Sequence, residues 1–125
     1  MIHLDTHVVA WLYSGKTERI PKSVMRRLER DSLVVSPMVE LELQYLFEIK
    51  RVNKPGHVVI DDLTRRIELA ISTAPFAAIV AEAAKLSWTR DPFDRLIAAQ
   101  AICESAPLVT ADQTIQKHIA RTIWE

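Results

Sequence analysis

Apolar residues along this chain fall into two patterns. Short apolar runs that end at polar or turn residues predict buried strands, at residues 2–4, 33–35, 70–73, 108–109 and 120–124. Longer stretches with helical spacing lie between them, at residues 6–13, 21–30, 37–51, 58–69, 75–88, 92–105 and 112–118. Cap and turn residues support these limits, since Ser36 and Asp91 each stand before a proline that fits the first helical position.

The alternation of short strands with helices predicts the fold class. Parallel strands need crossover connections, which are usually helices, and these helices cover both faces of the sheet. We therefore expect an α/β fold of three layers, α/β/α, around a short-stranded parallel central sheet. A length of 125 residues suits a single domain over residues 1–125. The pattern leaves the order of the strands open.

Composition narrows the functional classes only a little. The chain is 49% hydrophobic and 26% charged, which is typical of a globular protein. Sixteen basic residues balance sixteen acidic ones, so an RNA partner would have to be held by a local patch or by a metal ion. We interpret the lone Cys103, in an apolar run, as a small buried residue. No stretch is long enough to span a membrane and no signal peptide is evident, so we expect a cytoplasmic protein.

Three aspartates occupy equivalent places in the predicted fold. Asp5 follows the first strand, Asp112 follows the strand at 108–109, and Asp94 falls in the first turn of the helix that Asp91 opens. Carboxyl ends of parallel strands and amino ends of the following helices meet at one edge of a sheet, where ligands bind. We expect these three side chains to gather there.

Glu42 joins them by a different argument. Helical spacing places Glu42 among the apolar side chains of Met38, Tyr45, Leu46 and Ile49, whereas Glu40 projects to the opposite side. A carboxylate on a buried face is costly unless a charge compensates it. Clustered carboxylates repel one another, and a hard divalent cation such as Mg²⁺ or Mn²⁺ reverses that repulsion.

Each acid also has a purely structural interpretation. Asp91, Asp94 and Asp112 suit helix caps or first turns, which stabilise a helix without any further function. Glu42 could pair with a buried Arg or Lys. The coincidence of all four acids favours a metal site.

The motifs as a whole resemble PIN-domain nucleases, and most closely the VapC-type toxins of bacterial toxin–antitoxin pairs. The resemblance is carried by Asp5-Thr6-His7, by Ser36 with Glu42, by Asp91-Pro92-Phe93-Asp94-Arg95 and by Leu108-Val109-Thr110-Ala111-Asp112, and it covers nearly the whole chain. It departs at Leu41, where relatives often carry an aromatic residue before the glutamate.

This resemblance implies a PIN-like fold and an Mg²⁺-dependent endoribonuclease, with Mn²⁺ as a substitute, that cleaves RNA phosphodiesters through activated water. It implies Asp5, Glu42, Asp94 and Asp112 as the catalytic and metal-binding acids, and Thr6, Asp91 and Thr110 as supporting residues. It also implies a homodimer that a small antitoxin protein neutralises by inserting a segment near the site.

The basic and aromatic residues leave alternatives open. Lys50 and Arg51, with Lys54, form the densest basic cluster, which either belongs to solvated helix faces or contacts RNA phosphates. Arg95 is a candidate RNA or antitoxin contact beside Asp94. The four histidines lack zinc-site spacing. The tryptophans, Trp11, Trp88 and Trp124, lie too far apart in the sequence to predict a base-stacking platform.

Three other functions remain as hypotheses. A phosphatase of the haloacid dehalogenase type would use Asp5 as a nucleophile, but His7 stands where such enzymes carry their second aspartate. A housekeeping RNA-processing nuclease would use the same four acids. A non-catalytic interaction module would use the fold only to bind a partner.

Overall fold

The computed structural model describes every residue from Met1 to Glu125. Strands and helices alternate along the chain, as the sequence predicts. In order they are β1 (Ile2–Leu4), α1 (Thr6–Ser14), the short 3-10 helix η1 (Thr17–Arg19), α2 (Lys22–Arg30), β2 (Leu33–Val35), α3 (Pro37–Glu48), α4 (Gly56–Ile67), β3 (Ala70–Ile71), α5 (Phe76–Ala83), α6 (Pro92–Cys103), β4 (Leu108–Val109), α7 (Gln113–His118) and β5 (Thr122–Ile123).

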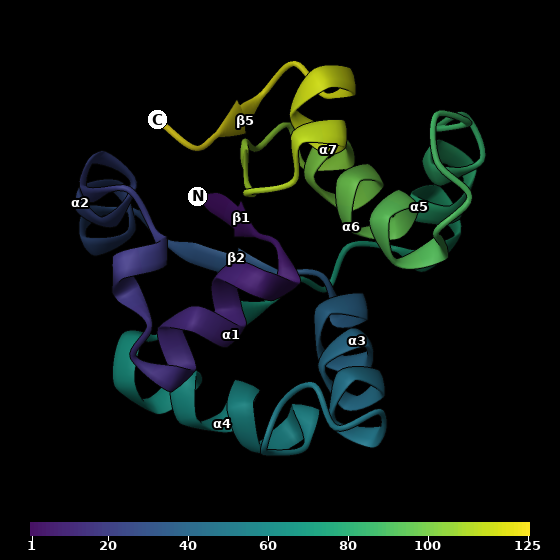
Figure 1. Ribbon diagram of the computed structural model, residues 1–125. Helices are drawn as coiled ribbons and strands as arrows, with labels where there is room; N and C mark the ends of the chain where they lie inside the picture. The colour runs from purple at the N-terminus through teal and green to yellow at the C-terminus, as the bar shows by residue number, and fades with distance from the viewer.

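The five strands form one sheet in the order β3-β2-β1-β4-β5, and every neighbouring pair is parallel. Figure 1 shows α1 and α4 on one side of this sheet and α5, α6 and α7 on the other. The predicted three-layer α/β/α class with a parallel sheet is therefore confirmed. Because the chain runs from β1 to β2 and β3 but later from β4 to β5, the direction of winding reverses between β1 and β4. In open α/β sheets a ligand site lies beyond the carboxyl ends of the strands at such a reversal.

The core lies between the sheet and its helices. Its completely buried side chains include Leu4, Val35 and Leu108 from the strands and Leu43 and Ile97 from the helices. A smaller cluster of Ile79, Ala83 and Ala99 joins α5 to α6. None of the helices combines the length and apolarity that a membrane span requires.

Several helices end or begin at different residues from those predicted. The helix expected over 37–51 ends at Glu48, because Lys50 adopts a positive φ of 63°. The helix expected over 75–88 ends at Ala83, and beyond it Leu86 and Trp88 pack against the core. The alanines of this segment favour a helix, but the stability of a helix in a protein comes mainly from packing. Here the packing of Leu86 and Trp88 against the core ends the helix early.

The start of α4 shows why a glycine is needed there. The helix begins at Gly56 rather than near Val58, and its first residue is buried against α3. A Cβ at this position would overlap the carbonyl oxygen of Glu40 and lie 3.1 Å from the backbone nitrogen of Gln44. Gly56 therefore allows α3 and α4 to approach closely.

The interpretation of Cys103 as buried is wrong. Its side chain is exposed, and Sγ lies 3.8 Å from the carbonyl oxygen of Ala78. The buried face of α6 contains Ile97, Ala98 and Ala101. Cys103 comes two residues after Ala101, which is about 200° around the helix, so it turns outward.

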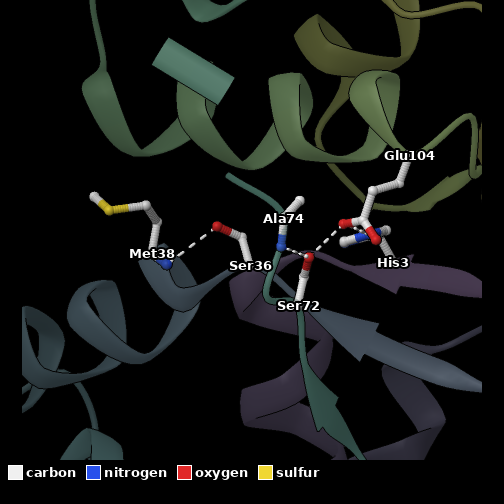
Figure 2. Close-up of polar contacts among 6 residues, drawn as sticks. All are labelled: His3, Ser36, Met38, Ser72, Ala74 and Glu104. Carbon is white, nitrogen blue, oxygen red and sulfur yellow. Dashed lines mark hydrogen bonds and ion pairs between the residues drawn. The ribbon is translucent and has the colours of Figure 1, made fainter. Parts of the chain in front are cut away.

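A buried polar cluster joins β1 to the end of α6. In Figure 2, His3, Ser72 and Glu104 converge, with His3 Nε2 at 3.0 Å and Ser72 Oγ at 2.5 Å from Glu104 Oε1. Burial lowers the pKa of His3 below its usual 6.5, and the neighbouring Glu104 opposes that shift. The cluster links three segments that are distant in sequence and gives His3 Nε2 a partner, whereas Nδ1 of the same ring is buried without one.

Candidate acidic site

Asp5 stands at the carboxyl end of β1, the central strand. It is the N-cap of α1, where Oδ1 accepts a hydrogen bond from the Thr6 amide at 2.8 Å. Its other oxygen, Oδ2, accepts a hydrogen bond from Thr110 Oγ1 at 2.6 Å. Asp5 is only 7% exposed, so both carboxylate oxygens are held inside the protein at the end of the strand.

Thr110 connects the ends of β1 and β4. The two strands pair in register, and the Asp5 amide donates to the Val109 carbonyl at 3.0 Å. Thr110 is fully buried, and its Oγ1 also accepts a hydrogen bond from the Asp112 amide at 3.0 Å. Asp112 in turn caps α7, with Oδ1 accepting from the amides of Thr114 and Ile115. One hydroxyl therefore fixes the relative positions of Asp5 and Asp112.

Glu42 reaches the same place from α3. Its Oε1 accepts a hydrogen bond from Thr6 Oγ1 at 2.5 Å, which ties it to the residue beside Asp5. The predicted face of α3 needs a correction, because the fully buried side chains are Val39 and Leu43, whereas Tyr45 and Ile49 are 48% and 45% exposed. Glu42 is half-buried at the border of these two faces. It therefore faces a cavity rather than the core.

The amino end of α6 supplies two more acids. Asp91 caps the helix, and its Oδ1 accepts from the amides of Phe93 and Asp94 at 2.8 and 3.3 Å. Asp94 lies in the first turn and is half-buried. The Asp94 carboxylate accepts no hydrogen bond from the protein and lies in the same cavity as the other acids.

These acids line one cavity of about 380 Å³. Its walls are Asp5, His7, Trp11, Glu42, Asp91, Asp94, Ala111 and Asp112. No Lys or Arg lines this cavity, and none of its acids is in an ion pair. We call it the acidic pocket. It contains all four acids that the sequence singles out, and sequence reasoning missed His7 and Trp11 as parts of its wall.

Burial and mutual repulsion perturb the carboxylates of the acidic pocket. Burial raises the pKa of Asp5, against the hydrogen bonds from Thr110 and Thr6. Burial also raises the pKa of Glu42, with the Asp5 charge adding to it. For Asp94, burial and then the charges of the four other acids raise the pKa from 3.8 to about 7. Removing water and gathering like charges both favour the protonated form.

The geometry and donor set of the pocket can be compared with a metal site. Its carboxylate oxygens are the ligands that hard divalent cations prefer, and no basic side chain competes for them. In this structure, no group of three Asp, Glu, His or Cys side chains is close enough together to coordinate a metal ion. The type of the donors fits a hard divalent cation, whereas their present spacing sets the carboxylates apart around the cavity.

The basic residues singled out in the sequence lie outside the acidic pocket. Arg95 donates from Nε to the Thr89 carbonyl at 2.8 Å and so fastens the loop before α6. Lys50 is exposed in the turn after α3 and lines neither this pocket nor its neighbour. Arg51 lines a second, adjacent cavity.

Comparison with known proteins connects this geometry to a family. The PIN domain model matches residues 2–121. Ribonuclease VapC22 of Mycobacterium tuberculosis is 31% identical over 118 residues, which cover 92% of this chain and 89% of that protein.

Solved structures share the fold over the full chain. VapBC-1 from nontypeable Haemophilus influenzae matches with a TM-score of 0.68 and 23% identity, covering 100% of this chain and 97% of that chain. VapBC2 from Rickettsia felis, bound to a DNA fragment from its promoter, matches with a TM-score of 0.64 and 24% identity, covering 100% and 98%. At these identities the likeness concerns the fold.

Proposed function

Because this chain belongs to the PIN-domain family, within its VapC-type proteins, we propose that it is a divalent-metal-dependent endoribonuclease that acts in the cytoplasm as the toxin of a toxin–antitoxin pair. The observation that carries the proposal is the acidic pocket, where Asp5, Glu42, Asp94 and Asp112 meet with no basic side chain among them. Gathering four negative charges lowers the stability of the fold, so such a cluster is expected only where a bound cation or a function compensates the repulsion.

In this proposal the four acids hold Mg²⁺, or Mn²⁺ in its place. The ion would supply an activated water and stabilise negative charge on the scissile phosphate and the departing oxygen. A cation would stabilise Asp94 most, since burial and four neighbouring acids raise the pKa of its carboxyl group to about 7.

The remaining residues of the pocket keep the acids in place. Thr110 and Thr6 fix Asp5 and Glu42 through their hydroxyls, at 2.6 and 2.5 Å. Asp91 and Asp112 each use one oxygen to cap a helix, which leaves the second oxygen of each without a backbone donor. Orienting groups of this kind determine how well a metal site works.

The proposed partners are RNA, a small antitoxin and a second copy of the chain. Apolar side chains are exposed along α3, at Leu41, Tyr45 and Ile49, and on α5, at Phe76 and Val80. Leu41, Tyr45 and Ile49 recur every four residues, so they form one exposed apolar stripe along α3. Such a stripe supports burial against another protein chain.

Cleavage of RNA by purified protein tests the proposal. We expect cleavage with Mg²⁺ or Mn²⁺, none with EDTA, and none from the Asp94→Asn variant. Asp61→Asn, an exposed acid on α4, is the matched control and should cleave like the wild type. Full activity of Asp94→Asn would reject the site.

Expression in a bacterial host separates the finer alternatives. Growth arrest by the wild type, but not by Asp5→Asn, supports a toxin. Metal-dependent cleavage without growth arrest would instead favour RNA processing. Absence of both cleavage and Mn²⁺ binding by calorimetry would favour a non-catalytic interaction module.

A further inference from the structure

A second cavity, of about 330 Å³, opens beside the acidic pocket. It lies between the end of α1 with η1 on one side and α3 with the loop to α4 on the other. Its walls include four basic side chains and no acidic one, and the basic residues are Lys16, Arg19, Arg51 and Lys54. We call it the cationic groove. His7 and Trp11 line both cavities, so the two adjoin along these residues.

The four cations of this groove are free to bind an anion. All four are exposed, and none forms an ion pair with an acid of the chain. The chain as a whole has a net charge of zero. Positive and negative charges are therefore separated locally, with acids in one cavity and cations in its neighbour. A basic groove of this kind attracts a polyanion even on a neutral protein.

Trp11 stands at the junction of the two cavities. Its ring centroid lies 6.1 Å from that of Trp124 and 6.2 Å from that of His7. Trp11 and Trp124 are far apart in the sequence, and they become neighbours because β5 brings Trp124 beside α1, where both side chains also pack against the core. The Arg19 guanidinium lies 6.0 Å from the Trp11 centroid, at the outer limit of a cation–π contact. An aromatic wall next to basic side chains is the combination that binds single-stranded nucleic acid.

We propose that the cationic groove binds the stretch of single-stranded RNA adjoining the bond that is cleaved. Lys16, Arg19, Arg51 and Lys54 contact its phosphates, and Trp11 stacks on a base at the junction. The inference rests on the proposed ribonuclease function, since it places the scissile phosphate in the acidic pocket. A base reaches Trp11 only when it is unstacked, which is why the substrate is single-stranded at this position.

The groove also offsets the repulsion between the acidic pocket and an approaching RNA strand. A phosphate approaching several carboxylates is repelled until metal ions compensate them. Cations in the adjoining cavity attract the flanking phosphates and hold the strand where that repulsion is strongest. An antitoxin segment is the competing occupant, because half of the side chains lining the groove are apolar. Four unpaired cations and the junction with the acidic pocket favour the RNA strand.

Binding of a fluorescein-labelled single-stranded oligoadenylate tests the groove by anisotropy over a salt series. The Asp94→Asn background prevents cleavage of the probe. The test variant adds Arg51→Gln and Lys54→Gln. The matched control adds Arg26→Gln and Arg30→Gln, two exposed arginines on α2 that line neither cavity.

We expect the test variant to bind more weakly than the control. Its plot of log affinity against log salt should be less steep by about 1.4, or about 0.7 for each of two lost phosphate contacts. Trp11→Leu, checked for folding by thermal unfolding, should weaken binding about tenfold or more with an unchanged slope.

Equal affinity and slope in the test and control variants would overturn the proposal. It would also be overturned if the test variant kept RNA affinity but lost a co-expressed antitoxin, because the groove would then dock protein. The cleavage assay on the wild type tests the ribonuclease function independently of this binding experiment. Groove-dependent RNA binding by a protein that never cleaves RNA would reject the ribonuclease and the placement of a scissile phosphate in the acidic pocket, and would keep only the assignment of the groove as an RNA-binding site.

Discussion

Substituting Asp94 by asparagine should stabilise the protein when divalent ions are removed. Burial and the other acids raise the pKa of Asp94 from 3.8 to about 7. The folded protein therefore holds this proton more tightly than the unfolded chain does. The protonated Asp94 carries no electrostatic penalty, so its contribution to the free energy of unfolding is complete below pH 3.8. This contribution is lost as the pH rises to about 7, and above that pH the cost of the ionised carboxylate stays constant. Asparagine never carries the charge and avoids that penalty.

The magnitude follows from competing effects. The difference between 3.8 and about 7 sets a ceiling of about 4 kcal/mol, at 1.36 kcal/mol per pH unit. Since Asp94 is half-buried and partly reached by water, screening reduces this to about 1–2 kcal/mol. Loss of a negative charge from the first turn of α6 costs about 0.3–1 kcal/mol. The net gain is therefore at most about 1.7 kcal/mol, or up to about 7 °C in Tm.

Thermal unfolding in EDTA measures this gain. At about pH 8 the Asp94→Asn variant should melt above the wild type, and the difference should shrink as the pH falls towards about 4. Asp61→Asn, with an exposed carboxylate, should show no comparable gain. Adding Mg²⁺ should stabilise the wild type more than the variant, because a ligand that binds only the folded state raises its stability. An Asp94→Asn protein that melts below the wild type at about pH 8 in EDTA would refute the reasoning.

Three further substitutions test the support of the site. Thr110→Val removes the hydrogen bonds to Asp5 and from the Asp112 amide, so we expect a loss of about 1–3 kcal/mol in urea denaturation and a fall of about 10- to 100-fold in RNA cleavage. Ser36→Ala removes the N-cap of α3 and should lower the free energy of unfolding by about 1 kcal/mol. Gly56→Ala introduces a Cβ against the carbonyl oxygen of Glu40 and should cost about 1–3 kcal/mol in a thermal melt.

Matched controls separate these effects from the generic cost of a mutation. Thr64→Val and Ser23→Ala change exposed residues and should be nearly neutral. Gly15→Ala meets no neighbouring atom within 4 Å but has a φ of 76°, so its cost should reflect backbone strain alone, about 1 kcal/mol. Equal stability of Thr110→Val and Thr64→Val would contradict the role given to Thr110. A neutral Gly56→Ala would contradict the close approach of α3 and α4.

Much of the fold was predictable because its signals are local. Strands such as Leu33–Val35 are continuous apolar runs, and caps such as Ser36 and Asp91 form the hydrogen bonds that their residue types suggest. Helix ends were less predictable because they depend on packing. The helix that begins at Phe76 ends at Ala83 because Leu86 and Trp88 pack against the core, and no residue near Ala83 indicates this end in the sequence.

The acids of the site were predictable because the carboxyl ends of parallel strands lie at the same edge of the sheet. Asp5 and Asp112 follow neighbouring parallel strands, so the parallel sheet itself brings them together. The face of α3 was harder to predict, since Tyr45 and Ile49 are apolar yet exposed. The groove was predictable only in part. Arg51 and Lys54 belong to the basic cluster that the sequence singles out, whereas Lys16 comes from a separate segment and joins them only in the fold. Trp124 reaches Trp11 only through the last strand.

The central position of β1 has a consequence for synthesis of the chain. Its partner β4 begins at Leu108, so Asp5 acquires the Thr110 hydroxyl only after another 105 residues have been made. Contacts between residues so far apart form late in folding, because the intervening chain must first be closed into a loop. A ribosome-bound fragment therefore carries Asp5 and Glu42 but no assembled centre. The acidic pocket would therefore form only after Thr110 and Asp112 have left the ribosome.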